Sequence, residues 1–203
     1  MSLQLLIELQ GVANPTVWRR VVVPESASFE ELHFLIQLVF GWENEHLYEF
    51  ANNGPKSLSG FREPVFIEPA EDSGSMFSMF GPTLGKKSVD SSKARVGDFF
   101  LKPSDFMVYT YDFGDNWEHK VTLESIDQNA LEAPDLIDGA GLCPPEDCGG
   151  FPGWDHLKKA MTRLTEDDMA MLEWYYGWSR PPKRFSPNKW DEKGVRKALK
   201  EWK

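Results

Sequence analysis

Residues 28–41 read SFEELHFLIQLVFG, and this stretch decides the fold class. Its apolar side chains recur every three or four positions, which predicts a helix with one apolar face. Ser28 and Glu31 have the spacing of a capping box, and Gly41 stands where many helices end in a left-handed residue. We therefore expect a well-bounded helix that lies across one face of a sheet.

The sequence around this helix predicts strands. Residues 3–10 place an apolar side chain at every second position, and the valine-rich residues 16–23 follow after an Asn14-Pro15 turn, so the two should pair as a hairpin. A short strand is expected at residues 46–50. Two strands, a helix and a third strand are the opening of a β-grasp-like sheet with a helix packed across one face.

A second hairpin is expected further along the chain. Residues 106–113 and 117–124 alternate between apolar and polar side chains around a Gly114-Asp115-Asn116 turn. Residues 127–153 are rich in Asp, Glu, Gly and Pro and are expected to form a loop. Helices are then expected at residues 154–164, 166–176 and 191–202. The predicted fold class is α+β, with a mixed or antiparallel sheet and C-terminal helices.

The length favours a single domain over residues 1–203, because globular domains commonly have about 100–200 residues. Residues 52–92 differ from the rest, since 17 of these 41 residues are Gly, Ser or Pro. A structureless stretch of this length is uncommon inside a domain, so we interpret it as an insertion or flap. Residues 180–203 are interpreted as a basic segment with a C-terminal helix.

The formal net charge is −10, from 22 basic and 32 acidic residues, which argues against nucleic-acid or membrane binding by simple electrostatics. The charge is uneven. Residues 180–203 carry nine Lys and Arg against three Asp and Glu, whereas residues 112–148 carry ten acids and one Lys. Either the tail packs beside the acidic stretch and neutralises it, or the acidic surface binds a cation or a basic partner.

The sequence shows no targeting or membrane segment. Met1 leads directly into the first strand pattern, and no apolar run approaches the roughly 18–20 residues of a membrane helix. Two cysteines are ordinary for an intracellular protein. We therefore expect a cytoplasmic protein that does not enter the membrane.

Several motifs, in order along the chain, resemble those of a known family. They are Val17-Trp18-Arg19-Arg20, Phe40-Gly41-Trp42, His46-Leu47-Tyr48-Glu49-Phe50, the run from Tyr109 to His119, the run from Cys143 to Gly150, and Gly153-Trp154. Over about residues 3–180 the chain resembles the Ri-plasmid open-reading-frame-three-like family, also labelled insertion-element passenger TnpR-like. The resemblance implies little about function, because members are mostly uncharacterised. The second label would imply a resolvase, which no serine and arginine pattern in this sequence supports.

The turn of the second hairpin carries the first candidate site. Asp112, Asp115 and His119 lie on or beside it, and a tight turn brings such groups within a few ångströms. Two carboxylates and an imidazole are suitable ligands for a divalent cation and could also form an acid-base cluster. The alternative is structural: turn aspartates bond their own backbone, and His119 is a hydrogen-bonded histidine on the same strand face as Trp117.

The second candidate site is the loop Cys143-Pro144-Pro145-Glu146-Asp147-Cys148. Its cysteines are half of the four-ligand set of a structural zinc site. Three interpretations stay open: a rigid structural loop, a metal or catalytic loop, and a redox pair, which the cytoplasm disfavours. A site shared with the 112–119 turn requires the two segments to lie within about 10 Å, since ligands bind at about 2.0–2.6 Å.

The sequence has no phosphate-binding glycine loop, His-Glu-x-x-His helix or Gly-x-Ser-x-Gly elbow, so the usual signals for nucleotide hydrolysis, zinc proteolysis and serine hydrolysis are absent. Three functional hypotheses are left. The leading one is a non-catalytic module that binds a protein or peptide through an acidic, aromatic-lined surface, with candidate residues Asp112, Asp115, Trp117, His119, Glu146 and Asp147. The alternative is a metal-assisted hydrolase that uses Asp112, Asp115 and His119 of the turn with Glu146 and Asp147 of the loop. The candidate metal ligands are Asp112, Asp115, His119, Cys143 and Cys148. The third is nucleic-acid binding through the basic tail, against which the total charge argues.

Overall fold

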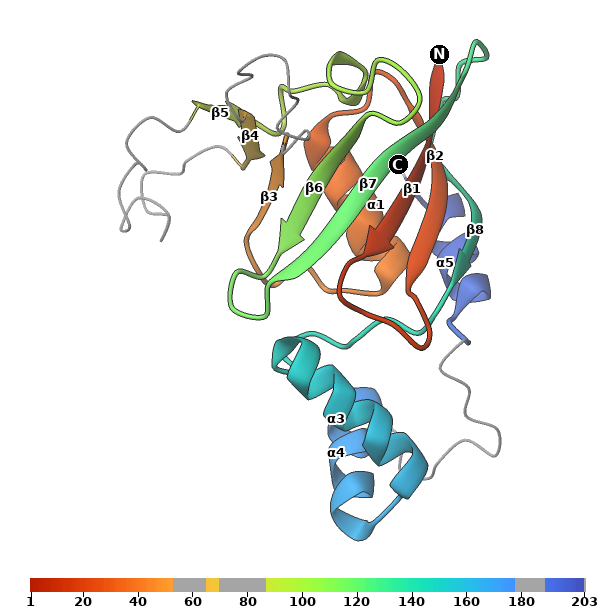
Figure 1. The fold of residues 1–203 in the computed structure, drawn as a ribbon. Coiled ribbons are helices and arrows are strands. Elements are labelled where there is room, and N and C mark those ends of the chain that lie inside the picture. Colours follow the sequence, from red (N-terminus) through yellow and green to blue (C-terminus); the bar gives the residue numbers. More distant parts are fainter. Residues whose placement is uncertain (53–64, 70–86, 178–188, 203) are drawn as a thin grey trace.

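The structure is a computed structural model, and it describes residues 1–52, 65–69, 87–177 and 189–202. In these ranges the chain combines one eight-stranded mixed sheet with four α-helices and a short 3-10 helix at Val96–Asp98 (Figure 1). The predicted α+β class, with a helix across one face of the sheet and further helices toward the C-terminus, is confirmed.

The strands pair in the order β5-β4-β3-β6-β7-β1-β2-β8. All neighbours are antiparallel except β4 and β5, which are parallel. The two predicted hairpins form the centre of the sheet, where β7 lies beside β1. The strands are β1 (Ser2–Leu9), β2 (Trp18–Pro24), β3 (Tyr48–Ala51), β4 (Val65–Glu68), β5 (Lys87–Asp90), β6 (Phe106–Tyr111), β7 (Trp117–Asp127) and β8 (Asp135–Ala140).

Helix α1 (Phe29–Phe40) covers one face of this sheet (Figure 1). The predicted capping box is present: the Ser28 hydroxyl accepts from Glu31 N, and Glu31 accepts from Ser28 N at 2.6 Å. Gly41 ends the helix with a φ of 82°. The apolar stripe of α1 is buried against the inward side chains of the sheet, among them Leu5, Ile7, Val21, Val121 and Leu123.

The C-terminal helices take two different positions. Helices α3 (Gly150–Arg163) and α4 (Glu166–Tyr176) pack against each other beyond one end of the sheet, and α5 (Glu192–Lys200) lies beside β8 (Figure 1). The tail therefore does lie beside part of the acidic stretch, where Arg196 donates to the carbonyl oxygens of Leu136 and Ile137. No helix in the described ranges is long and apolar enough to span a bilayer.

Three strands lie where the sequence predicted irregular structure. The expected loop at 127–153 was wrong in part, because it contains β8, whose sequence DLIDGA has little strand propensity. β8 forms because it pairs with β2 from Trp18↔Ala140 to Val22↔Asp135. Strands β4 and β5 lie inside the 52–92 stretch, most of which falls outside the described residues.

Candidate metal centre

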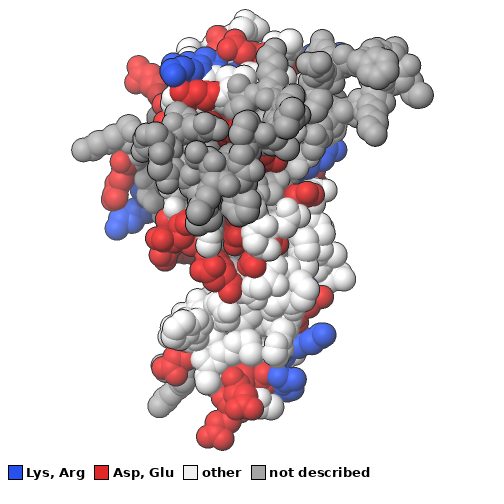
Figure 2. All heavy atoms as spheres, turned by 90° about the vertical axis from the view of Figure 1, so that its left-hand side faces the viewer, with Lys and Arg blue, Asp and Glu red and all other residues white. Residues whose placement is uncertain are grey.

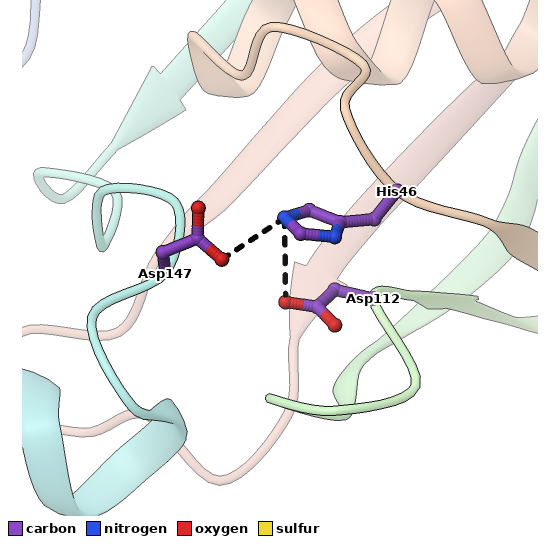
Figure 3. A group of neighbouring side chains, drawn as sticks. All are labelled: His46, Asp112 and Asp147. Carbon is purple, nitrogen blue, oxygen red and sulfur yellow. Dashed lines mark ion pairs between the residues drawn. The ribbon is translucent and has the colours of Figure 1, made fainter.

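Three segments that are far apart in the sequence meet at one end of the sheet. They are the chain between α1 and β3, the β6–β7 turn and the loop before α3. Each contributes one side chain to a cluster of His46, Asp112 and Asp147, whose ligand atoms all lie within 4.8 Å of one another (Figure 3). His46 Nε2 is 3.8 Å from Asp112 Oδ2 and 3.2 Å from Asp147 Oδ1.

Asp112 is fixed by the turn that it begins. Its backbone has a left-handed φ of 54°, its N–H donates to Leu47 O at 3.0 Å, and its carbonyl accepts from Asn116 N at 2.6 Å. Its Oδ1 accepts from Gly114 N at 2.8 Å, an Asx turn of the kind expected for a hairpin aspartate. One carboxylate oxygen is thus engaged by the backbone, and the other faces His46.

His46 is placed by strand pairing across the sheet. Tyr48 of β3 pairs with Tyr111 of β6, so the residues just before β3 lie beside the residues just after β6. His46 Nε2 is shielded from solvent and has no hydrogen-bond partner of good geometry among the described residues, although a carboxylate oxygen lies 3.2 Å away. A buried ring nitrogen in this state has an unused ligand position.

Asp147 comes from the Cys143–Cys148 loop, and its side chain is 74% exposed. Its backbone has a left-handed φ of 55°, and its carbonyl accepts from Tyr175 of α4 at 3.1 Å. The loop is tied to the β6–β7 turn, because Gly149 N donates to Asp115 Oδ2 at 3.1 Å. The structure therefore brings the turn and the loop into direct contact, as a shared site requires.

A hydrogen-bond network lies directly behind the cluster. The Tyr111 hydroxyl accepts from Glu45 N at 3.0 Å and His46 N at 3.3 Å, and it donates to Glu146 Oε1. Glu146 Oε2 accepts from Glu43 N at 3.1 Å. Burial first, and then Glu146, raise the pKa of Tyr111, so its hydroxyl stays protonated and acts as the donor.

His119 and Trp117 lie elsewhere. Both are fully buried in the core between the sheet and α1, and the structure does not bring His119 to Asp112 or Asp115. The ring of His119 meets the rings of Phe40 and Trp42 edge-on, and its Nδ1 lies 3.1 Å from Trp117 O. Burial lowers the pKa of His119 to about 3, which keeps the imidazole neutral.

The two cysteines are free thiols with buried side chains. Burial raises the pKa of Cys143 strongly and that of Cys148 to about 12, so both are protonated at neutral pH. A cysteine binds a metal as the thiolate. Among the residues that the structure describes, the cluster that could hold an ion consists of His46, Asp112 and Asp147, without either thiol and without Asp115 or His119.

The distances within the cluster suit one small cation. Two ligand atoms at about 2.1 Å from a metal are about 3.0 Å apart at a right angle and about 3.4 Å apart at a tetrahedral angle. The 3.2 Å separation from His46 to Asp147 lies between these two values, and the 3.8 Å separation from His46 to Asp112 is slightly longer than both. The exposed Asp147 side chain has the freedom to close the remaining gap toward Asp112.

The surroundings of the cluster are acidic. Figure 2 looks onto the side that carries the β6–β7 turn and shows acidic side chains gathered at its middle. Four further acidic residues lie next to the cluster, placed there by hydrogen bonds of Glu43 N, Glu45 N, the Tyr111 hydroxyl and Asp115 Oδ2: Glu43, Glu45, Asp115 and Glu146. Such an arrangement favours a cation over an anion at this place.

Residues 1–193 match the family described as "Plasmid pRiA4b ORF-3-like protein". The chain belongs to this family. A relative from Sinorhizobium fredii (strain NBRC 101917 / NGR234), "Uncharacterized protein y4hQ", is 35% identical over 164 residues, which are 79% of this chain and 74% of the relative. The predicted resemblance is thereby confirmed.

A solved structure in the comparison supports the fold of this pRiA4b ORF-3-like chain. The "Crystal Structure of Protein of Unknown Function MM3350 from Methanosarcina mazei Go1" is 31% identical and superimposes with a TM-score of 0.72. The match covers 96% of each chain. The arrangement of sheet and helices is therefore one that this chain shares with a structure of similar length.

The sequence missed His46 as a candidate ligand in this pRiA4b ORF-3-like chain. It stands 66 positions before Asp112, and no local spacing connects the two. The alternating patterns of β3 and β6 were visible, but the pairing of Tyr48 with Tyr111 was not. Only that register would have placed His46 beside the turn.

Proposed function

We propose that this chain is a binding module whose ligand is a divalent transition-metal cation, held by His46, Asp112 and Asp147. The observation that carries the proposal is the solvent-shielded Nε2 of His46, which faces two carboxylates at 3.2 and 3.8 Å without a hydrogen bond. Imidazole suits Zn²⁺ and carboxylates suit Mn²⁺, whereas sites made only of oxygen ligands favour Mg²⁺ and Ca²⁺. A ligand set of one imidazole and two carboxylates therefore supports Zn²⁺ or Mn²⁺ as the preferred cation.

Cation titration tests this proposal. The protein is treated with a chelator, dialysed, and titrated calorimetrically with Zn²⁺, Mn²⁺, Mg²⁺ and Ca²⁺. We expect one equivalent of Zn²⁺ or Mn²⁺ to bind at least about tenfold more tightly than Mg²⁺ or Ca²⁺. The variants His46→Ala, Asp112→Asn and Asp147→Asn should each lose at least about tenfold in affinity.

Matched controls come from helices α3 and α4. His156 and Asp167 are exposed there and are not part of the cluster, so His156→Ala and Asp167→Asn should bind as the unchanged protein does. The proposal is wrong if no cation binds stoichiometrically, or if the controls lose as much as the ligand variants. An oligolysine peptide is titrated in parallel; binding of the peptide without any cation would favour the protein or peptide partner instead.

A second candidate function rests on the number of ligands. Three protein ligands leave a position for water on a four-coordinate cation, which is how catalytic zinc sites are built. A metal-assisted hydrolase is therefore supported by the open side of the site at the exposed Asp147. Turnover of chromogenic ester or amide substrates by the Zn²⁺-loaded protein, lost in His46→Ala, is the result that this candidate requires.

We also propose that the protein works in the cytoplasm. The two cysteines of the Cys143–Cys148 loop are free thiols, the state that a reducing compartment maintains. Thiol titration of protein from cell lysate under denaturing, non-reducing conditions should find two reactive groups; none would contradict this location.

A further inference from the structure

The three proposed ligands share a neighbour relation. His46, Asp112 and Asp147 each directly follow a residue of the hydrogen-bond network behind the site, namely Glu45, Tyr111 and Glu146. The Tyr111 hydroxyl contacts both of the others. If this hydroxyl moves, the residue directly before each of the three proposed ligands is affected, and only one peptide bond separates that residue from the ligand.

The network joins the three segments that carry the ligands. On one side, the Tyr111 hydroxyl holds the backbone N–H groups of Glu45 and His46. On the other side it donates to Glu146 in the loop of Asp147. Trp42 adds a parallel link, because its ring stacks on Tyr111 at 5.0 Å and its Nε1 donates to Pro144 O at 2.9 Å.

Glu146 is not itself available as a ligand. Its Oε1 accepts from the Tyr111 hydroxyl and its Oε2 accepts from Glu43 N, so each carboxylate oxygen already has a donor. Asp147 is the next residue in the sequence, and it is the acid of this loop whose carboxylate faces His46. The two neighbouring acids thus have different tasks.

We propose that Tyr111 and Glu146 are positioning residues of the cation site: their hydrogen bond holds the chain segment of His46 and the loop of Asp147 at the separation that one cation requires. This inference rests on the proposed cation site and adds the residues that set its geometry. Partners that orient metal ligands from behind commonly change affinity by about 10- to 100-fold when they are removed.

Paired substitutions test this role. Tyr111→Phe removes only the hydroxyl, and Glu146→Ala removes its acceptor; each should weaken Zn²⁺ binding at least about tenfold. Glu146→Gln keeps one side-chain oxygen for the Tyr111 hydroxyl and should recover most of that loss. Tyr48→Phe is the matched control, because the Tyr48 hydroxyl bonds Ser91 Oγ at 3.0 Å, away from the cluster.

Cobalt gives a readout that loss of stability alone would not move. The visible absorption of bound Co²⁺ reports coordination number and symmetry, and it is recorded well below the melting temperature of each variant. We expect Tyr111→Phe and Glu146→Ala to change the band intensities, and Glu146→Gln and Tyr48→Phe to retain the original spectrum.

The outcomes separate the two proposals. If Tyr111→Phe and Glu146→Ala bind Zn²⁺ within twofold of the unchanged protein and keep its Co²⁺ spectrum, the positioning role is wrong and the cation site stands. If the unchanged protein binds no cation, or binds it equally after His46→Ala, the cation site itself is wrong. Should Tyr111→Phe fail to fold, the difference between Glu146→Ala and Glu146→Gln decides: equal affinities overturn the positioning role.

Discussion

The Cζ atom of Arg19 lies 3.8 Å from the centre of the Trp190 ring. This contact joins strand β2 to the segment that leads into α5, and Trp190 Nε1 also donates to Gly139 O at 3.1 Å. The buried guanidinium donates to the carbonyl oxygens of Val39, Trp18, Ala140 and Gly141. Burial lowers the pKa of Arg19 to about 10, which leaves it charged at neutral pH. A buried cation thus helps to hold the basic tail on the sheet.

Trp190→Ala should release this contact and destabilise the fold. The substitution removes a partly buried ring, a cation–π contact worth about 0.5–2 kcal/mol and the indole hydrogen bond. We expect a loss of about 2–3 kcal/mol in the free energy of unfolding, measured by urea denaturation. Trp174→Ala is the control, because Trp174 is 84% exposed and its loss should change stability by less than about 0.5 kcal/mol. Equal effects at the two positions would contradict the role of the contact.

Arg19→Lys should be costly although it keeps the charge. An ammonium group lacks the planar fork that reaches several carbonyl oxygens at once, and each buried acceptor left without a donor costs about 1–3 kcal/mol. We expect a loss of at least about 3 kcal/mol.

The neighbouring Arg20 is the matched control for Arg19→Lys. It pairs with Glu124 at 2.6 Å on the partly exposed face of the sheet. Pairs of this kind contribute about 0–1 kcal/mol, so Arg20→Lys should lose no more than that. Chemical denaturation of both variants gives the comparison, and an Arg19→Lys loss as small as that of Arg20→Lys would refute the argument.

The parts of the fold that the sequence predicted are those whose local patterns agree with their surroundings. Helix α1 has its capping box, apolar stripe and Gly41 in sequence order, and helix α4 spans the predicted residues 166–176, with Thr165 as its N-cap. β8 could not be predicted, because residues 135–140 become a strand only through pairing with β2. Tertiary context decided that element, as it often does for strands.

The candidate site was predictable in part for a similar reason. Asp112 and Asp147 were visible because each stands in a distinctive turn or loop, and the structure places both at the cluster. His119 was drawn into the prediction by its closeness in sequence, but the alternation of β7 directs it to the buried face with Trp117 and Val121. Closeness in sequence therefore does not bring two side chains together in a strand, because successive side chains point to opposite faces of the sheet.

The stability of the protein should fall as the pH drops below about 6.5. Burial lowers the pKa of His33 to about 4 and that of His119 to about 3 in the folded state. Well above pH 6.5 the two histidines are neutral in both the folded and the unfolded chain. Below about pH 6.5 they bind protons in the unfolded chain but stay neutral in the folded one. Each histidine costs up to about 1.4 kcal/mol per pH unit once the unfolded chain is fully protonated. Because protonation of the unfolded chain is only half complete at pH 6.5, the loss for both histidines between pH 6.5 and 5 is about 3 kcal/mol.

Urea denaturation at pH 7.0, 6.5, 6.0, 5.5 and 5.0 measures this slope. The window stays above the range in which ordinary carboxylates titrate, so the two histidines dominate it. The exposed His156 serves as the control, and His156→Gln should leave the slope unchanged. A stability that is constant from pH 6.5 to 5 would show that the buried histidines do not resist protonation.

Gly150→Ala should damage the candidate site, while Gly177→Ala should not. Both glycines have a φ of +63°, so the backbone strain of an alanine is similar at the two positions, about 1–2 kcal/mol. Their surroundings differ. A Cβ on Gly150 would lie 2.9 Å from Asp115 O, whereas nothing lies within 4 Å of a Cβ on Gly177.

The clash at Gly150 pushes apart the two segments that form the cluster. Asp115 accepts from Gly149 N, so a shift there moves the loop of Asp147 away from His46 and Asp112. Zn²⁺ titration of Gly150→Ala should therefore show a loss of affinity of at least about tenfold. This is the loss commonly seen when residues that orient the metal ligands are removed. Gly177→Ala should lose only stability, seen as a lower urea midpoint with unchanged affinity. If both variants bind Zn²⁺ equally well, the contact between turn and loop does not set the geometry of the site.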